Sequence, residues 1–472
     1  MYSGLLLAVL LPAIICPAAY AFQVQQSSPL PVAQPQINST TFQGSQREGK
    51  ATSGVLPLSL NAAIARGLRY NLGLILTRQS TQSAHGQQLT ELQSLLPTVD
   101  ASLKASVQQT DLQAQGLRIP GFPSIIGPYG YTDIRASLNW SLLNLSALQS
   151  YLASKHNFRA AKLSVYDARD MVVLTVGNAY LTCIADKSRI DEAKAQVSTA
   201  KISLDQADDN HKAGTAPLLD VLRAKVDYQT QQQSLIAAKD VYAKERIALA
   251  RAIGLPLDQK FKLTSQEPYA PLDHLDADTA VKQALAARSD LKALREQVAA
   301  AEHARKAATD ERLPVIKFKG DYGDIGVNPS HSHGTGDATG TLDVPVFEEA
   351  RLRGDAKQAQ ARLDAERARL SDLQGQISAD VRDSILDIQA AEKQVGVARS
   401  NVDLAREALN EAQERYKAGV DNNLAVSQAL SAMAQADTLY VSSLYQHNMA
   451  KLSLARALGV AGNDYEMYVG GK

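Results

Sequence analysis

The sequence is poor in aromatic residues and carries no net charge. Aromatic residues make up 5% of the 472 residues, and 49 acidic residues balance 49 basic ones. So few aromatic side chains argue against a large globular core, whereas long stretches rich in Ala, Gln, Leu, Asp and Arg are typical of long helices. The balanced charge gives no indication of a nucleic-acid partner.

Long hydrophobic runs are missing beyond the N-terminus. Residues 1–21 form a short apolar run that ends in Ala19-Tyr20-Ala21, a pattern typical of a secretory signal peptide. Pro12 and Pro17 interrupt the run, so a transmembrane helix is not predicted there, although a buried N-terminal helix is an alternative. No later stretch reaches about 18 uninterrupted apolar residues, so we expect no membrane-spanning helix elsewhere.

Cysteine is also scarce. Cys16 lies within the predicted signal peptide, and Ile15 before it is larger than the residue that lipid attachment normally requires. Cys183 is then the one cysteine left after export, so no internal disulfide is possible. We expect it to be a small buried apolar residue.

Catalytic and cofactor motifs are absent from the sequence. There is no HExxH, GxSxG, Walker or GxGxxG motif, so we expect neither enzymatic activity nor a cofactor. His331 and His333 come nearest to a metal site, but no third ligand lies close by in the sequence. An exposed pair of histidines in a loop is the simpler interpretation.

The chain does contain an internal repeat, in which the same segments occur twice in the same order. A segment rich in Pro, Gln, Ser and Thr, residues 22–56, is predicted to be an extended linker. We then divide the chain into a first repeat at 57–260, a second repeat at 261–462 and a tail at 463–472. Six landmarks recur in the same order, among them Leu96-Pro97 with Leu313-Pro314, Gly214 with Gly419, and Gly254 with Gly459.

Each repeat contains two segments in which apolar and polar residues alternate. They run from Val99 to Val107, from Ile134 to Leu142, from Ile316 to Tyr322 and from Ala338 to Val346. Alternation over about ten residues is typical of membrane barrels, but a half-buried sheet in a soluble domain shows it too. Four strands are too few to close a barrel, and open edges cannot face lipid. If these strands cross a membrane, several chains must share one barrel, and three chains would supply about twelve strands.

Two stretches without proline are predicted to be very long helices. They run from Ser146 to Gly214 and from Glu348 to Gly419, and each would be roughly 100 Å long. Apolar residues recur in them at heptad spacing, which favours a coiled coil or a wall of packed helices. A glycine ends each helix, and a shorter return helix follows, so we predict two hairpins with tips far from the strands. Short helices beginning near Leu58 and Asp278 are expected to cover the part of each long helix that its return leg does not reach.

The order of these motifs resembles the TolC family of outer-membrane factors. The segments LSLNAAIARGLRYNLGL, LLPTV, HKAG, LDVLRA and RAIGL carry the resemblance, which extends from Pro57 to Val460. It implies a mainly α protein with membrane β-strands: a homotrimer with a twelve-stranded barrel in the outer membrane above an α-helical barrel in the periplasm. It also implies a passive exit duct that serves an inner-membrane pump and a periplasmic adaptor, in efflux or in type I secretion.

The resemblance also nominates functional residues. In the family the hairpin tips meet the adaptor, which points here to Lys212, Gly214, Thr215, Lys417, Gly419 and Val420. Asp220 matches a tip aspartate, so it is a candidate for a periplasmic gate; alternatively, it favours the dipole at the start of a helix. Ala425 and Gln428 stand where well-known members carry constricting aspartates, which puts an electronegative ring at that level in doubt.

A different class of protein fits part of the pattern. A secreted or periplasmic coiled-coil scaffold, or an adaptor, would also contain long helical hairpins. Adaptors normally have one hairpin in each chain, whereas this chain has two, each with alternating strands at its base. The duplication therefore favours the channel.

Overall fold

The computed structural model describes residues 39–114, 116–264, 269, 271–272, 275–421, 423–462 and 467–468. All of them belong to one compact unit, Ile37–Lys472. The predicted signal peptide and most of the predicted tail lie outside the described residues.

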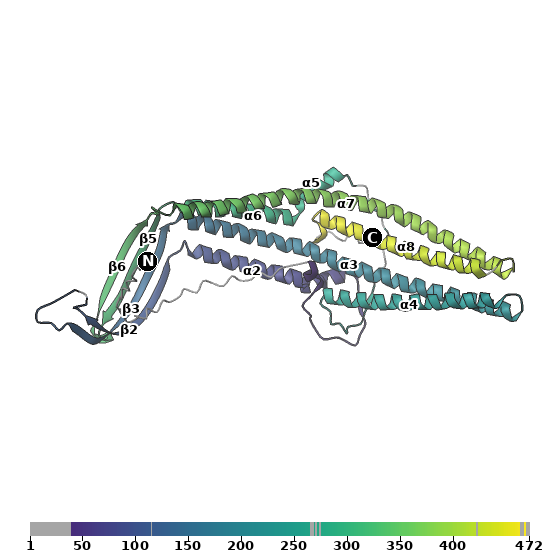
Figure 1. The fold of residues 1–472 in the computed structure, drawn as a ribbon, viewed down its shortest axis with the longest axis horizontal. Helices are drawn as coiled ribbons and strands as arrows, with labels where there is room; N and C mark the ends of the chain where they lie inside the picture. The colour runs from purple at the N-terminus through teal and green to yellow at the C-terminus, as the bar shows by residue number, and fades with distance from the viewer. Residues whose placement is uncertain are drawn as a thin grey trace, which may run out of the picture. The chain divides into compact units, whose positions relative to one another are not determined.

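Two long helices form the backbone of the fold. The helix α3 spans Leu145–Lys212 and α7 spans Glu349–Lys417, within a few residues of the predicted bounds. With 68 and 69 residues, each is about 100 Å long. The shorter helices α4 (Leu218–Ala252) and α8 (Asn423–Ala457) fold back along them, which confirms the two predicted hairpins (Figure 1).

The turn at each hairpin tip depends on a glycine. Gly214 has a φ of 77° and Gly419 a φ of 72°, the left-handed conformation that the sequence predicts for a residue just beyond a helix. The N–H of Thr215 donates to the carbonyl of Asn210 at 2.9 Å, and the α7–α8 turn repeats this bond between its matching residues. These bonds satisfy carbonyls that a helix end would otherwise leave unpaired.

The short helix predicted at the start of each repeat is in fact a pair of helices. In the first repeat these are α1 (Leu60–Tyr70) and α2 (Leu72–Gln93). Asn71 separates them and caps α2, because its Oδ1 accepts the N–H of Gly73 at 2.9 Å. In the second repeat they are α5 (Ala277–Ala287) and α6 (Ser289–Asp310).

The second helix of each pair covers the strand-proximal half of the long helices. The helix α2 packs against α3, and α6 packs against both α3 and α7. The sequence predicts this covering role but assigns it to the residues that form α1 and α5. Because α6 belongs to the second repeat and α3 to the first, this packing joins the two repeats.

A four-stranded antiparallel sheet lies at the other end of the helices from the tips (Figure 1). Its order is β2 (Thr98–Asp111), β3 (Ile125–Leu143), β5 (Val315–Gly326) and β6 (Ser332–Asp343). All four predicted strands are therefore present, two from each repeat.

Two strands differ most from the prediction. The strand β3 begins at Ile125, well before the predicted start at Ile134. The strand β6 begins at Ser332 and ends at Asp343, so His333 lies within a strand and Val344 and Val346 lie beyond it. Gly334, Gly336 and Gly340 interrupt the apolar alternation, which hides the first half of this strand from the sequence pattern.

Residues 39–56 are more than a linker. A short 3₁₀-helix, η1 (Ser39–Gln43), buries Phe42, whose carbonyl accepts a hydrogen bond from the amide of Asn71. The strand β1 (Leu56–Leu58) then pairs in parallel with β4 (Phe261–Leu263), which follows α4. Strands of three residues are too short for a periodic pattern, so the sequence does not predict them.

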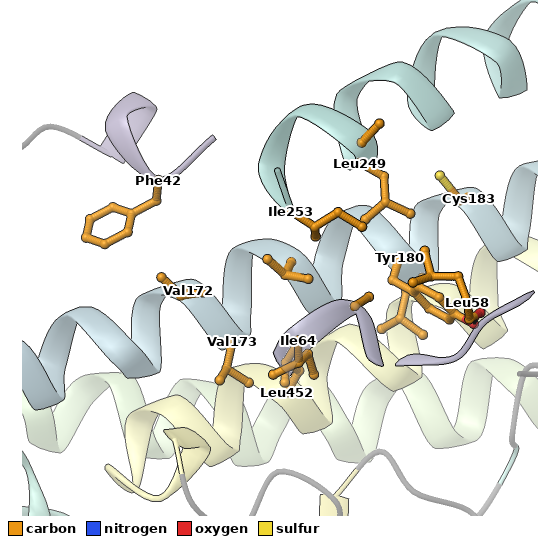
Figure 2. Packing of buried hydrophobic residues seen from close by; sticks show 14 of the residues in the cluster. Phe42, Leu58, Ile64, Val172, Val173, Tyr180, Cys183, Leu249, Ile253 and Leu452 are labelled. Atoms are coloured by element: carbon orange, nitrogen blue, oxygen red, sulfur yellow. Dashed lines mark hydrogen bonds between the residues drawn. The ribbon is translucent and has the colours of Figure 1, made fainter. Parts of the chain in front are cut away.

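The largest apolar core lies where these segments meet α3. Tyr180 is fully buried there and donates its hydroxyl proton to the carbonyl of Leu58 at 2.8 Å; Ile64, Cys183 and Leu249 surround it (Figure 2). Cys183 is thus the buried apolar residue that was expected. Among the described residues, no helix is both long enough and apolar enough to cross a membrane.

Candidate functional site

Both hairpin tips are open to solvent. The turn between α3 and α4 carries Lys212, Gly214 and Thr215, and the turn between α7 and α8 carries the other predicted contact residues, Lys417, Gly419 and Val420. All six are exposed, and the two tips lie at the same end of the helices (Figure 1).

The tip lysines are held by acids of their own helices. Lys212 pairs with Asp208, and this hydrogen-bonded pair raises the pKa of the lysine. Lys417 pairs with Glu414 at 2.9 Å. Such exposed pairs within one helix contribute little stability, so either lysine can exchange its partner for an acidic group on another protein.

The two tips are built differently below the turn. In the first, the ring of His211 hydrogen-bonds through Nδ1 to the carbonyl of Ala216 at 2.9 Å, which closes the turn on itself. In the second, the matching residue is Tyr416, which is buried against Val426 and Leu430. The second tip is therefore anchored in the body of the molecule by its side chains.

Asp220 does not project into solvent as an open gate residue would. It lies in the first turn of α4 and is 5% exposed, with its carboxylate 3.8 Å from the guanidinium of Arg223. An acid in this position favours the helix dipole, as the alternative interpretation holds. Ala425 is half-buried and Gln428 is exposed on α8.

A residue that the sequence does not single out joins the two hairpins. The buried amide of Asn423 donates through Nδ2 to the backbone carbonyl of Asp220 at 3.3 Å. Asn423 belongs to the sequence Asp-Asn-Asn that follows the tip, and such residues are common in turns, so its sequence position gives no sign of a contact between hairpins.

The sheet has one apolar and one polar face. The cross-strand register places Leu103 opposite Ile134 on one face, and the other carries Arg135, which pairs with Asp133 on its own strand and Asp321 on β5. The apolar side chains have no covering layer: Val99, Leu103 and Val107 are 70 to 78% exposed. In the described chain, the outer edges of β2 and β6 pair with no further strand.

Exposed apolar side chains also follow α4 and α7. These are Leu218, Leu219, Leu222, Val226, Ile236, Val241 and Ile247 on α4, and Leu386, Val397 and Leu404 on α7. Most recur three, four or seven residues apart, so each helix presents an apolar stripe that nothing in the described chain covers.

Comparison with known proteins agrees with this architecture. The family model described as outer membrane efflux protein matches residues 74–255 and 280–460, once in each repeat. The chain is 25% identical over 414 residues to the probable efflux pump outer membrane protein SepC of Pseudomonas putida, covering 84% of this chain and 82% of SepC.

Two solved structures show the same fold. The CmeC outer membrane channel of Campylobacter jejuni superimposes with a TM-score of 0.77 at 17% identity, over 92% of this chain and 93% of CmeC. The outer membrane protein VceC of Vibrio cholerae gives 0.75 at 18% identity, over 85% of this chain and 96% of VceC.

Long paired hairpins above a two-faced sheet define an outer-membrane channel protein with its helices in the periplasm. The match covers most of both repeats, so the chain belongs to the outer membrane efflux protein family. It is the outer-membrane channel component of a tripartite efflux system.

Proposed function

We propose that three copies of the chain form a passive exit duct across the outer membrane and the periplasm. The open edges of the sheet carry this proposal. Unpaired backbone groups of β2 and β6 cannot face lipid, so the edge of one copy must pair with the edge of the next. Three copies would supply about twelve strands, enough to enclose a pore.

The helices support the same assembly. The apolar stripes on α4 and α7 would each be covered when helices of neighbouring copies pack side by side. The polar face of the sheet, with Arg135 and its two aspartates, would then line the barrel, and the apolar face would contact lipid.

The exposed tips are the surface for a periplasmic adaptor, which in turn links the duct to an inner-membrane pump. Lys212 and Lys417 offer exchangeable charges there, and Val420 offers an apolar contact. The names of relatives favour efflux over type I secretion: one is a toluene efflux pump outer membrane protein of Pseudomonas putida, TtgF. The energy would come from the pump, and this chain would do no chemistry.

The periplasmic gate would lie at the level of Asp220, Ala425 and Gln428. Asp220 would act through its backbone bond to Asn423, which ties the first hairpin to the second, and not through an exposed carboxylate. The exposed amide of Gln428 would replace the acids expected at a constriction.

Single-channel conductance in a planar bilayer tests the duct, together with the mass of the purified protein in detergent. We expect discrete conductance steps from a trimer-sized particle. A monomer or dimer that needs no detergent and conducts no current would contradict the proposal and favour a coiled-coil scaffold.

A further inference from the structure

A cavity of about 480 Å³ lies beside the middle of α7 and the C-terminal end of α8, close to α5. Five of its lining residues are apolar: Leu272, Leu275, Ile385, Ile388 and Leu454. The other three are Gln389, Glu392 and Lys393, on consecutive turns of α7. A cavity of this size, mainly apolar and with a few polar groups, has the character of a small-molecule site.

The equivalent positions of the first repeat are filled by side chains. The spacing that relates Gly214 to Gly419 also relates Tyr180 to Ile385 and Leu249 to Leu454. In the first repeat, Tyr180 and Leu249 are fully buried in a continuous core (Figure 2).

Two changes leave the second repeat hollow. The Tyr180 ring is replaced by the smaller side chain of Ile385, and the buried Ile184 is replaced by Gln389, which lines the cavity. In addition, Leu58 belongs to the pair β1–β4, whereas its counterpart Leu275 lies outside any strand. The cavity thus lies where the second repeat departs from the residues of the first.

The lining of the cavity includes a carboxylate, Glu392, that forms no ion pair with the residues that the structure describes. Glu392 is half-buried and Lys393 is exposed, and neither forms an ion pair with any described residue. A half-buried carboxylate is stabilised by a cation that binds beside it. The chemistry that fits is therefore a positive charge attached to an apolar body.

We propose that this cavity binds a small hydrophobic amine. Its apolar body contacts Ile385, Ile388 and Leu454, and its ammonium group pairs with Glu392. The site lies away from both the hairpin tips and the sheet, so the proposal does not depend on the adaptor contact or on conductance.

Fluorescence titration of the full-length protein in lipid nanodiscs tests the charge. The probe is dansylcadaverine, which has an apolar body and a primary amine, and neutral dansylamide is its reference. Glu392→Gln should weaken binding of the amine about tenfold and leave dansylamide binding unchanged. Asp387→Asn, an exposed acid on the same helix that does not line the cavity, should change neither.

A second variant tests the location. Ile385→Tyr copies the residue that fills this space in the first repeat, so it should abolish binding of both probes. Asp387→Tyr, at an exposed position nearby that does not line the cavity, is the control and should bind like the parent. If the parent binds neither probe, or if Glu392→Gln and Ile385→Tyr both bind like the parent, the cavity is not a binding site for amines.

Discussion

At the scale of single residues, Tyr180 shows how the first repeat closes its core. Its hydroxyl donates to the Leu58 carbonyl, which also accepts the N–H of Thr264 at 3.0 Å. Tyr180→Phe therefore removes one hydrogen bond, and the Leu58 carbonyl keeps the other. We expect a loss of about 1 kcal/mol in the free energy of unfolding, measured from the helical circular dichroism signal. Tyr166→Phe, at an exposed position on the same helix, should lose nothing measurable.

Asp170 gives the molecule a pH-dependent contact at the end of the second repeat. It is 5% exposed and accepts the N–H of Gly462 through Oδ1 at 2.6 Å. Burial is the main reason that its pKa is raised from 3.8 to about 6, against the opposing effect of Arg456. Ionising Asp170 therefore costs more in the folded protein than in the unfolded chain.

The sign of the effect follows from the raised pKa. Above about pH 6 the buried carboxylate destabilises the fold, and this cost disappears as the pH falls through 6 towards 3.8. Asp170→Asn keeps an oxygen for Gly462 and should be more stable than the parent at pH 8, by about 2 kcal/mol. At pH 4.5 this difference in stability between the variant and the parent should be smaller. Thermal unfolding of both proteins at the two pH values measures the difference, and an equal difference at both would contradict this account.

At the scale of elements, the two hairpin tips are the proposed contact surface for the adaptor, and both are exposed. Introducing an acid at Thr215 or Val420, as in Thr215→Glu or Val420→Glu, places a like charge where an acidic adaptor surface would meet the tip lysines. We expect at least a fivefold weaker affinity for the adaptor, because a rim charge changes binding by about 1 kcal/mol. Surface plasmon resonance with the cognate adaptor measures it. Gln394→Glu, exposed on α7 away from the tip, should bind normally.

The bond between Asn423 and Asp220 is expected to hold the two hairpins together near their tips. Asn423→Ala removes it and leaves the Asp220 carbonyl buried without that donor. Spin labels attached at Thr215 and Val420 should then report a broader distribution of distances than in the parent. Asn401→Ala, at an exposed position on α7, provides the comparison. An unchanged distribution in Asn423→Ala would show that the packing of Tyr416 and Leu430 alone is sufficient.

The elements differ in how far the sequence predicts them. Long helices without proline and their C-terminal glycines, such as Gly214, are local features, so the sequence predicts α3, α7 and both turns. The bond from the Asn71 amide to the Phe42 carbonyl and the pairing of β1 with β4 join distant segments, and a single sequence does not display such contacts. The burial of Asp220 was missed for the same reason, because it depends on how α4 packs.

At the scale of the whole molecule, the uncovered apolar stripes imply assembly. Leu222→Glu places a charge in the stripe on α4, where a neighbouring copy would bury it. Each copy would then lose the burial of a leucine, about 2 kcal/mol, and would also bury a carboxylate. We expect the trimer fraction in detergent to fall, as measured by light scattering. A stable trimer of Leu222→Glu would place the interface elsewhere.

The packing of α6 against α3 has a consequence for biogenesis. A chain leaves the ribosome from its N-terminus, so the first repeat is complete before α6 and β5 exist. Until they arrive, the strand-proximal half of α3 is covered by α2 but not by α6, and the inner edge of β3 is unpaired. The two repeats are therefore halves of one cooperative unit, and the first would emerge into the periplasm as a client for chaperones that shield unpaired strands and apolar helix faces until the second half has been exported.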